Sequence, residues 1–412
     1  MRTFLKVAWM NVAILTTLLV GIECSAFGYY FVRRTLAGYD PVGAYVEAQV
    51  AKMPANGYPN PADRTWFGPY WREFNESTYA AVESVSYSNW HRYPFKGMYI
   101  NVGLDGRRAT WNQPPKEATR SIRVALLGGS TMWGTGARDE FTIASYVSKM
   151  LAETYPRRFD VVNYGQDGYV GTQEVITLLR EIQRDSIPDI AVFYDGYNEA
   201  FTAFQTGAAG FPMNEDNRTR EFNILHPSRS RDFYFEVLSR TNTFQLTRGV
   251  RTALSAATVE DPLKNTDLEM LAHDVVRVYF RNIEFVTAIE KRFGVVAQFF
   301  WQPSVYTKAR PTEREQSIIR ISGRFAPLYR QIHDAMKQVY RTTGPANFRD
   351  ISNVLDEYVG TAFIDPVHAT EVANEAVARE IVAGLKSTLE LTMSVPGNSP
   401  APRAREKERL SR

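Results

Sequence analysis

The sequence is poor in cysteine and has no large excess of charge of either sign. Cys24 is the single cysteine among 412 residues, which excludes an intramolecular disulfide and any metal site built on several cysteines. The 48 basic residues nearly balance the 45 acidic ones, and no basic stripe interleaved with aromatic residues points to nucleic acid. A phosphate-binding loop and a dinucleotide fingerprint are also missing. These absences exclude several function classes and leave the redox compartment open.

The overall composition is that of a globular protein. Hydrophobic residues make up 44% and charged residues 23% of the chain, which is the ordinary balance of a protein with a packed core. The length exceeds the roughly 100 to 200 residues of a typical domain. We therefore expect one large domain with a smaller companion.

An apolar run occupies residues 7–32 and is long enough to cross a bilayer, which takes about 20 residues. Trp9 near its start and Tyr29 and Tyr30 near its end resemble the aromatic residues found at membrane interfaces. Glu23 opposes a perfect fit, because an acidic group at the bilayer centre costs roughly 2.5 to 3.5 kcal/mol on insertion scales. The run indicates a retained transmembrane anchor.

Two alternatives to an anchor remain open for this run. A cleaved signal peptide would use the small residues Cys24 and Ala26 as an A-x-A-like cleavage site, and a buried core helix would have a similar composition. Basic residues flank the run almost evenly, so charge encodes the orientation only weakly. A short N-terminal tail before a long domain favours export of that domain.

The remaining chain divides by its pattern of apolar residues. Residues 35–120 are rich in Pro, Gly, Tyr and Trp and predict a lead-in of short strands and turns. From residue 121, apolar runs alternate with amphipathic stretches, as in parallel strands joined by helices. The expected strands are RVALLGG, DVVNYG, IAVFYDG and VVAQFFWQPS, and the expected helices lie near 141–155, 171–184, 266–293, 311–341 and 370–389.

This alternation predicts an α/β domain over residues 121–390 with a mostly parallel sheet covered on both faces. Ligand chemistry then belongs at the carboxyl ends of the strands. Residues 203–265 break the rhythm and indicate an insertion that could cover the strand ends. The polar, Pro- and Arg-rich residues 392–412 are expected to be disordered.

Ser130 follows the first expected strand in the sequence GGSTMWG. The two glycines permit a tight turn that lifts the serine side chain clear of the strand end. A serine hydroxyl needs a base within hydrogen-bonding distance to act as a nucleophile. The structural alternative is an ordinary helix N-cap, for which serine is well suited.

The segment Asp365-Pro366-Val367-His368 lies near the end of the expected domain. In a helical turn, an aspartate and a histidine three residues apart share one face. The carboxylate would then fix the imidazole tautomer and leave the other ring nitrogen as a base. Alternatively, Asp365 caps a helix that has Pro366 at its first position.

Two further positions follow expected strands. The side-chain amide of Asn198, in IAVFYDGYNEAF, and the backbone N–H of Gly168, in NYGQDGYVG, could stabilise a developing oxyanion. Both residue types are also common in ordinary strand-to-helix turns. Each signal is therefore weak when taken alone.

Together, GGST, NYGQDG, DGYN and DPVH resemble, in order, the four sequence blocks of the SGNH or GDSL hydrolases. The resemblance covers residues 121–390, and the anchor with INVGLDGRR is similar to a membrane-tethered bacterial branch of that family. It implies a flavodoxin-like three-layer fold and no cofactor. It also implies a nucleophilic Ser130, a base His368 supported by Asp365, and an oxyanion hole made by Ser130, Gly168 and Asn198.

The sequence departs from the family pattern at two positions. Gly129 stands where GDSL members usually have aspartate, and Glu199 follows Asn198 where many have aspartate. Neither departure removes a catalytic group. The first alters the polar support of Ser130.

The resemblance implies an esterase that removes small acyl groups, such as acetate from carbohydrate. A polysaccharide O-acetyltransferase and a non-catalytic anchored glycan-binding protein are the alternatives. Trp133, Tyr197 and Phe201 would suit stacking on a sugar. The histidines outside the site lack metal-ligand spacing and are interpreted as structural or surface residues: His91, His226, His273 and His333.

Overall fold

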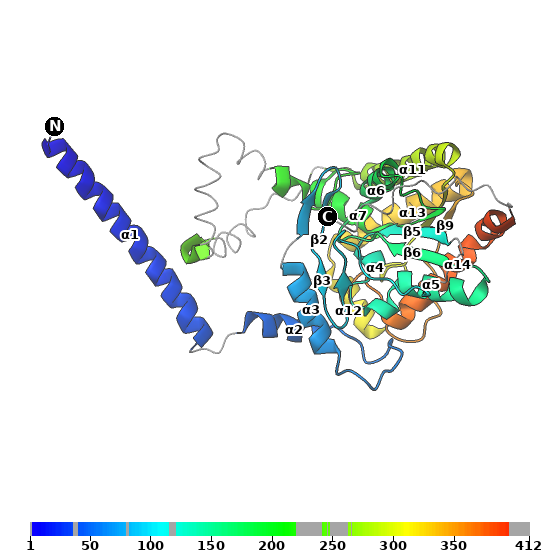
Figure 1. Ribbon diagram of the computed structural model, residues 1–412, viewed down its shortest axis with the longest axis horizontal. Helices are drawn as coiled ribbons and strands as arrows, with labels where there is room; N and C mark the ends of the chain where they lie inside the picture. The colour runs from blue at the N-terminus through cyan, green and yellow to red at the C-terminus, as the bar shows by residue number, and fades with distance from the viewer. Residues whose placement is uncertain are drawn as a thin grey trace.

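The computed structural model describes residues 2–35, 40–79, 82–114, 121–219, 241–244, 246–247, 263–264 and 266–394. Its centre is a five-stranded parallel sheet with the strand order β6-β5-β7-β8-β9 (Figure 1). Counted along the chain, this is the order 2-1-3-4-5 of flavodoxin-like folds. The strands are β5 (Ile122–Gly128), β6 (Phe159–Asn163), β7 (Ile190–Asp195), β8 (Val296–Trp301) and β9 (Phe348–Asp350).

The predicted α/β class and the four predicted strands are confirmed. Strand β9 was not predicted, because three residues are too short to show a period. Successive side chains of β5 point to opposite faces of the sheet. Val124 and Leu126 belong to one core cluster, and Ala125 and Leu127 belong to the other. Burial of each such aliphatic side chain stabilises the folded protein by roughly 1.5 to 3 kcal/mol.

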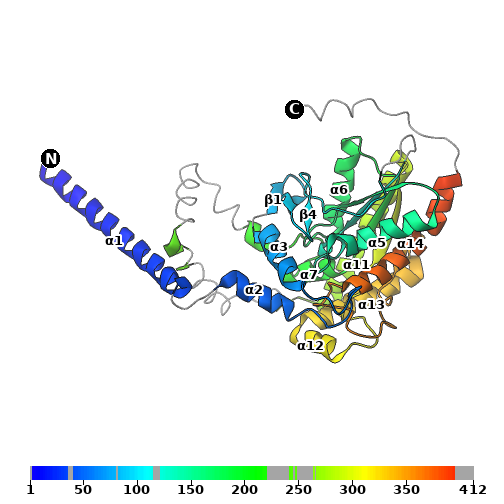
Figure 2. The ribbon, with the colours of Figure 1, turned by 60° about the horizontal axis from the view of Figure 1, so that its bottom comes forward.

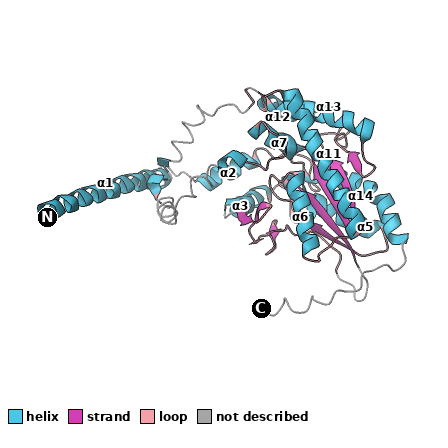
Figure 3. Cartoon of the chain, turned by 90° about the horizontal axis from the view of Figure 1, so that it is seen from above, coloured by secondary structure: helices cyan, strands magenta, loops and turns pink. Residues whose placement is uncertain are grey.

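Helices cover both faces of the sheet, so the domain has three layers (Figures 2 and 3). One face packs against α5 and α14, and the other packs against α6, α7, α11 and α13. The bounds are α5 (Ile143–Thr154), α6 (Gly171–Gln183), α7 (Tyr197–Thr206), α11 (Leu268–Phe293), α12 (Glu313–Ile321), α13 (Phe325–Thr343) and α14 (Glu371–Ser394).

The single helix predicted over 311–341 is wrong in one respect, because two helices occupy this range. Thr312 caps α12 by accepting a hydrogen bond from the N–H of Glu315. The chain then turns at Gly323, whose φ of 52° lies in the left-handed region. Glycine adopts this conformation without steric cost, so α13 starts in a new direction.

The lead-in was predicted as strands and turns, and its first half is instead helical. Helices α2 (Pro41–Val50) and α3 (Phe67–Tyr79) occupy it. Asp40 caps α2, and Pro41 suits its first turn. The apolar positions of α3 are aromatic and buried against one another, a helical pattern that the neighbouring Gly and Pro residues obscure in the sequence.

Short strands form the second half of the lead-in, as expected. The hairpin β1 (Val82–Val85) and β2 (Asn89–Arg92) is antiparallel, and so is the pair β3 (Phe95–Lys96) and β4 (Asn101–Val102). Most of the insertion at 203–265 and nearly all of the tail at 392–412 lie outside the described residues. The prediction of a disordered tail is therefore untested.

Helix α1 (Arg2–Thr35) projects from the rest of the molecule (Figure 1). Within the described part of the chain, Ala13–Arg33 is the one helical stretch whose length and composition suit a membrane span. Only 6% of this stretch is buried, which contradicts the alternative of a buried core helix. A membrane anchor and a signal sequence both remain consistent with it.

Candidate active site

Three of the predicted blocks meet at one end of the sheet. Ser130 is the first residue of the short helix α4 (Ser130–Trp133), directly after β5. Gly168 lies in the loop that follows β6, and Asn198 is the second residue of α7, just after β7. Strands β6 and β7 flank β5 on opposite sides. This is the switch point of the topology, where open α/β sheets bind ligands.

The fourth block completes a chain of hydrogen bonds at this edge. The Nε2 atom of His368 lies 2.7 Å from the Oγ atom of Ser130. On the other side of the ring, Nδ1 lies 2.6 Å from Oδ2 of Asp365. The His368 side chain is 16% exposed, so the site is reachable from solvent. The order hydroxyl, imidazole, carboxylate is the arrangement of a nucleophile, its base and the group that orients the base.

The turn that carries Asp365 and His368 is not helical, which corrects both readings of that segment from the sequence. The next helix, α14, begins only at Glu371. Oδ1 of Asp365 accepts hydrogen bonds from the backbone N–H groups of Val367, at 3.0 Å, and His368, at 2.9 Å. One carboxylate therefore folds the turn with one oxygen and holds the imidazole with the other.

Asp365 and His368 each stabilise the charged form of the other. Burial alone would raise the pKa of the Asp365 carboxyl, but the neighbouring imidazolium and the hydrogen bonds outweigh it and lower the pKa. Burial likewise opposes the charged form of His368, yet the Asp365 carboxylate raises the pKa of the imidazole. Asp365 is thus ionised when His368 accepts a proton, as a general base requires.

The predicted oxyanion-hole residues follow neighbouring strands at the same end of the sheet, and their role stays a prediction. The Ser130 N–H is at the first position of α4, where no helical carbonyl precedes it. Gly168 has a φ of 70°, which an L side chain rarely adopts. One N–H of the Asn198 amide donates to the Tyr169 carbonyl at 2.7 Å, and an amide has a second donor to offer.

The glycine at position 129 has a steric explanation. A Cβ atom built on Gly129 would lie well inside the van der Waals contact distance of the Asn198 Nδ2 atom. The aspartate that GDSL members usually have here could not fit unless Asn198 moved. The departure from the family pattern therefore accompanies a close approach of the Asn198 amide to the backbone beside Ser130.

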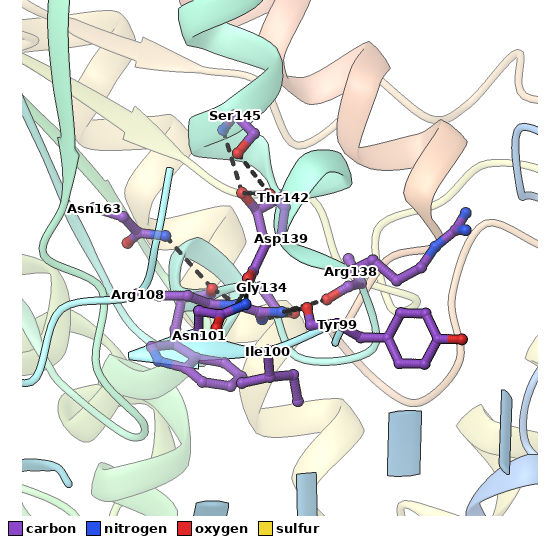
Figure 4. A network of polar contacts seen from close by, with 12 residues as sticks. Tyr99, Ile100, Asn101, Arg108, Gly134, Arg138, Asp139, Thr142, Ser145 and Asn163 are labelled. Atoms are coloured by element: carbon purple, nitrogen blue, oxygen red, sulfur yellow. Dashed lines mark hydrogen bonds and ion pairs between the residues drawn. The ribbon is translucent and has the colours of Figure 1, made fainter. Parts of the chain in front are cut away.

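A buried arginine of the lead-in supports the end of the helix that carries Ser130 (Figure 4). Arg108 donates to the carbonyl of Gly134 at 2.6 Å and to that of Ala137 at 2.6 Å, and its Nε atom pairs with Asp139 at 2.8 Å. Asn163, at the end of β6, donates to the Met132 carbonyl. No sequence motif pointed to a role for Arg108, although it ends the segment INVGLDGRR.

The lead-in also contributes charge beside the histidine. Arg92, at the end of β2, forms an ion pair with Asp167, and the Trp90 indole donates to the Asp167 carbonyl at 2.8 Å. The Asp167 charge raises the pKa of His368, while Arg92 opposes it. Asp167 precedes Gly168 within a recognised block, whereas no motif pointed to Arg92 or Trp90.

A second group of carboxyls lies buried behind the site. The Glu199 oxygens accept hydrogen bonds from the backbone N–H groups of Gly171 and Gly196, both at 2.8 Å. Burial and the nearby Asp195 carboxyl raise the pKa of Glu174 well above its usual range. Burial and the charge of Glu199 likewise raise the pKa of Asp195 well above its usual range. In the sequence, Glu199 stands out only as a departure from the family pattern.

The stacking role suggested for Trp133 is contradicted by its burial, and the role suggested for Tyr197 and Phe201 stays a prediction. Trp133 is fully buried beneath the guanidinium groups of Arg92 and Arg108, so it cannot reach a ligand. Tyr197 and Phe201 are stacked on each other and packed against the core.

The other described histidines take no part in the hydrogen bonds that join Ser130, His368 and Asp365, and His273 lies on α11. His91 pairs with Glu83, His333 bonds to Ser352, and His226 lies outside the described residues. Within the described ranges, no group of three or more His, Cys, Asp or Glu side chains is arranged to hold a metal ion.

Comparison with known proteins finds likeness only among solved structures. No protein-family model and no curated protein sequence matches the chain. A lipase/acylhydrolase from Enterococcus faecalis is 14% identical over 65% of this chain and 96% of its own, with a TM-score of 0.35. An acetylxylan esterase from Geobacillus stearothermophilus is 14% identical over 66% and 96%, with a TM-score of 0.34.

A protein assigned to the G-D-S-L lipolytic family, from Desulfitobacterium hafniense DCB-2, is 7% identical over 64% of this chain and 100% of its own, with a TM-score of 0.34. At such identities and scores, these neighbours say nothing about the substrate of this chain. The evidence for its chemistry is the arrangement of Ser130, His368 and Asp365 at the end of its own sheet.

Proposed function

We propose that the protein is a serine esterase of the SGNH type that forms an acyl-enzyme on Ser130. The observation that carries the proposal is the unbroken set of hydrogen bonds from Ser130 through His368 to Asp365. A structural role in capping a helix would explain Ser130 alone, and a structural role in folding a turn would explain Asp365 alone. Joining both to the two ring nitrogens of one histidine is what acyl transfer requires.

The proposed reaction has two steps. His368 Nε2 takes the proton of Ser130 as Oγ attacks the ester carbonyl, and the oxyanion is held by the N–H groups of Ser130 and Gly168 and the amide of Asn198. The alcohol leaves with the proton from His368. Water then attacks the acyl-enzyme with His368 again as base, which releases the acid and restores the serine.

The substrate class and the location are further parts of the proposal. The four blocks, by their family resemblance, favour small acyl groups, and acetyl esters on carbohydrate are the substrates that we infer. Helix α1 would anchor the enzyme, with the domain on the exported side of the membrane. A reporter fused after Arg412 tests this placement, and activity of the reporter in the cytoplasm would contradict it.

Labelling of the full-length protein with a fluorophosphonate probe tests the nucleophile. Wild-type protein should be modified, Ser130→Ala should not, and Ser317→Ala, which removes an exposed serine of α12, should react like wild type. A folded wild-type protein that is never labelled would instead support a glycan-binding protein without turnover.

The acyl acceptor needs a separate assay. Incubation with acetylated glycans should release acetate at a rate that does not depend on added sugar. If acetyl groups instead appear on an added polysaccharide and little free acid is released, the reaction is O-acetyl transfer and not hydrolysis.

A further inference from the structure

The acidic residue of the apolar helix has bonding partners far away in the sequence. Glu23 lies at the middle of Ala13–Arg33. Its Oε1 atom accepts hydrogen bonds from the backbone N–H of Asn242, at 2.6 Å, and from the Asn242 side-chain amide, at 2.8 Å. Its Oε2 atom accepts from the N–H of Thr243 at 2.9 Å. Both oxygens are therefore bonded to one short segment of the insertion.

The chemistry of this contact suits both partners. Residues 242–244 are helical, and the N–H groups at the start of a helix have no internal acceptor. A carboxylate placed there satisfies these donors. In return, the donors offset part of the cost of a charged group within an apolar span.

Two further observations agree with a docked segment. Ala26 lies one helical turn beyond Glu23 and is only 3% exposed, whereas the large apolar side chains around it, such as Ile22 and Phe27, are more than half exposed. The views in Figures 1 and 2 both place the short helical piece at 242–244 beside the C-terminal part of α1. One face of α1 is thus covered at the level of Glu23.

The beginning of the same insertion contacts the rim of the candidate site. The Met213 side chain lies against Gly168, close enough that a Cβ atom on that glycine would collide with it. The Arg218 guanidinium lies over the Trp90 ring at 4.7 Å from its centroid, and Trp90 bonds to Asp167. The insertion therefore contacts both the oxyanion-hole loop and α1.

We propose that Glu23 makes α1 an intramolecular docking surface for the insertion. Residues 241–244 are the docked segment, and the covered face of α1 includes Glu23 and Ala26. The docking does not depend on the proposed esterase activity. Its tests accordingly measure proximity and accessibility rather than turnover.

Chemical cross-linking in native membranes tests the proximity. In the full-length chain with Cys24→Ser, the pair Ala26→Cys and Thr243→Cys should be joined by a short bis-maleimide, because it keeps Glu23 and the backbone N–H groups that donate to it. The matched control replaces Ala26→Cys by Ser25→Cys, which lies at nearly the same depth but roughly 200° around the helix from Glu23. We expect the first pair to react and the control pair not to. Equal yields for the two pairs, or no product from either, would overturn the proposal.

The accessibility of residue 243 tests whether the Glu23 carboxylate holds the docked segment. Thr243→Cys, again with Cys24→Ser, should react slowly with an impermeant maleimide. Addition of Glu23→Ala should raise the labelling rate by roughly tenfold, because hydrogen bonds to a charged group are lost. Ser25→Ala, the control on the opposite face, should leave the rate unchanged. A rate that is the same with and without Glu23 would show that the carboxylate does not hold the segment.

Discussion

Asp365 and Asp195 are both aspartates near the carboxyl end of the sheet, yet their surroundings give them opposite properties. Asp365 faces the imidazole of His368, which lowers the pKa of its carboxyl against the effect of burial. Asp195, the last residue of β7, is buried beside Glu174 and Glu199, and its pKa is raised well above the usual range. The neighbours, rather than the residue type, determine which carboxyl is charged.

The two clusters therefore suit different tasks. The partly open pair of Asp365 and His368 can accept and return a proton from Ser130. The buried cluster is closed to solvent, and its member Glu199 bonds to Gly171 and Gly196 in the loops beside Gly168 and Asn198. We infer that the first cluster carries the chemistry and that the second positions the oxyanion-hole loops.

The largest effect is expected from Asp365→Asn. The amide can still accept from the backbone N–H groups of the turn, but its NH₂ group would face Nδ1 of His368 and favour the wrong tautomer. The kcat for ester hydrolysis should fall by about 10⁴-fold, with the fold retained by circular dichroism. A loss below tenfold would show that the carboxylate does not orient the base.

The same variant has a predicted pH signature. The base must be neutral to act, so wild-type kcat/KM should rise with pH through the pKa of His368. Since Asp365 raises that pKa, Asp365→Asn should move the inflection to lower pH. An inflection that stays in place would assign the titration to another group.

Asn198→Ala should produce the next largest effect. It removes an amide that we expect to donate to the oxyanion, which is worth about 10² to 10³ in kcat, while KM should change little. Asn198→Asp is the matched variant, because it keeps the size but replaces the donor by a charge. If both variants retain wild-type kcat, Asn198 has no part in the oxyanion hole.

The sequence predicted the sheet well because its central strands are long apolar runs. β7, for example, is buried at every residue, as a central parallel strand should be. The helices of the lead-in were missed because neighbouring Gly and Pro residues obscure their short helical patterns. In α3, Tyr70 also packs within a cluster that includes Ile364, and the local sequence does not show this distant partner.

The candidate site was predictable where its residues stand directly after strands. Ser130, Gly168 and Asn198 were located in this way, and His368 was located through a short motif. Arg92 and Glu199 were not assigned roles, because their importance arises from burial and from partners in other elements. The non-helical turn at Asp365 was also missed, since its shape depends on hydrogen bonds from the carboxylate to the backbone.

Glu199→Gln links the two clusters and should have a smaller effect on rate. A glutamine cannot accept from both Gly171 and Gly196, because its NH₂ group must face one of these N–H donors. The free energy of unfolding should fall by about 1 to 3 kcal/mol, and we expect kcat to fall by roughly tenfold as the loops shift. Urea unfolding and steady-state kinetics measure the two effects. Glu174→Gln, in the same cluster but bonded to neither glycine, should leave kcat nearly unchanged.

The smallest effect is expected from Asp195→Asn, and it should appear mainly in the pH dependence of stability. The pKa of Asp195 is higher in the folded than in the unfolded chain, so its contribution is complete below its unfolded pKa, about 3.9. This contribution is lost as pH rises toward the folded pKa. An asparagine cannot ionise, so between pH 5 and pH 8 the variant should lose less unfolding free energy than wild type, by on the order of 1 kcal/mol. Asp334→Asn, an exposed change of equal charge on α13, should follow the wild-type curve. If Asp195→Asn also follows that curve, the buried cluster is ionised like the open one and the contrast between the two aspartates fails.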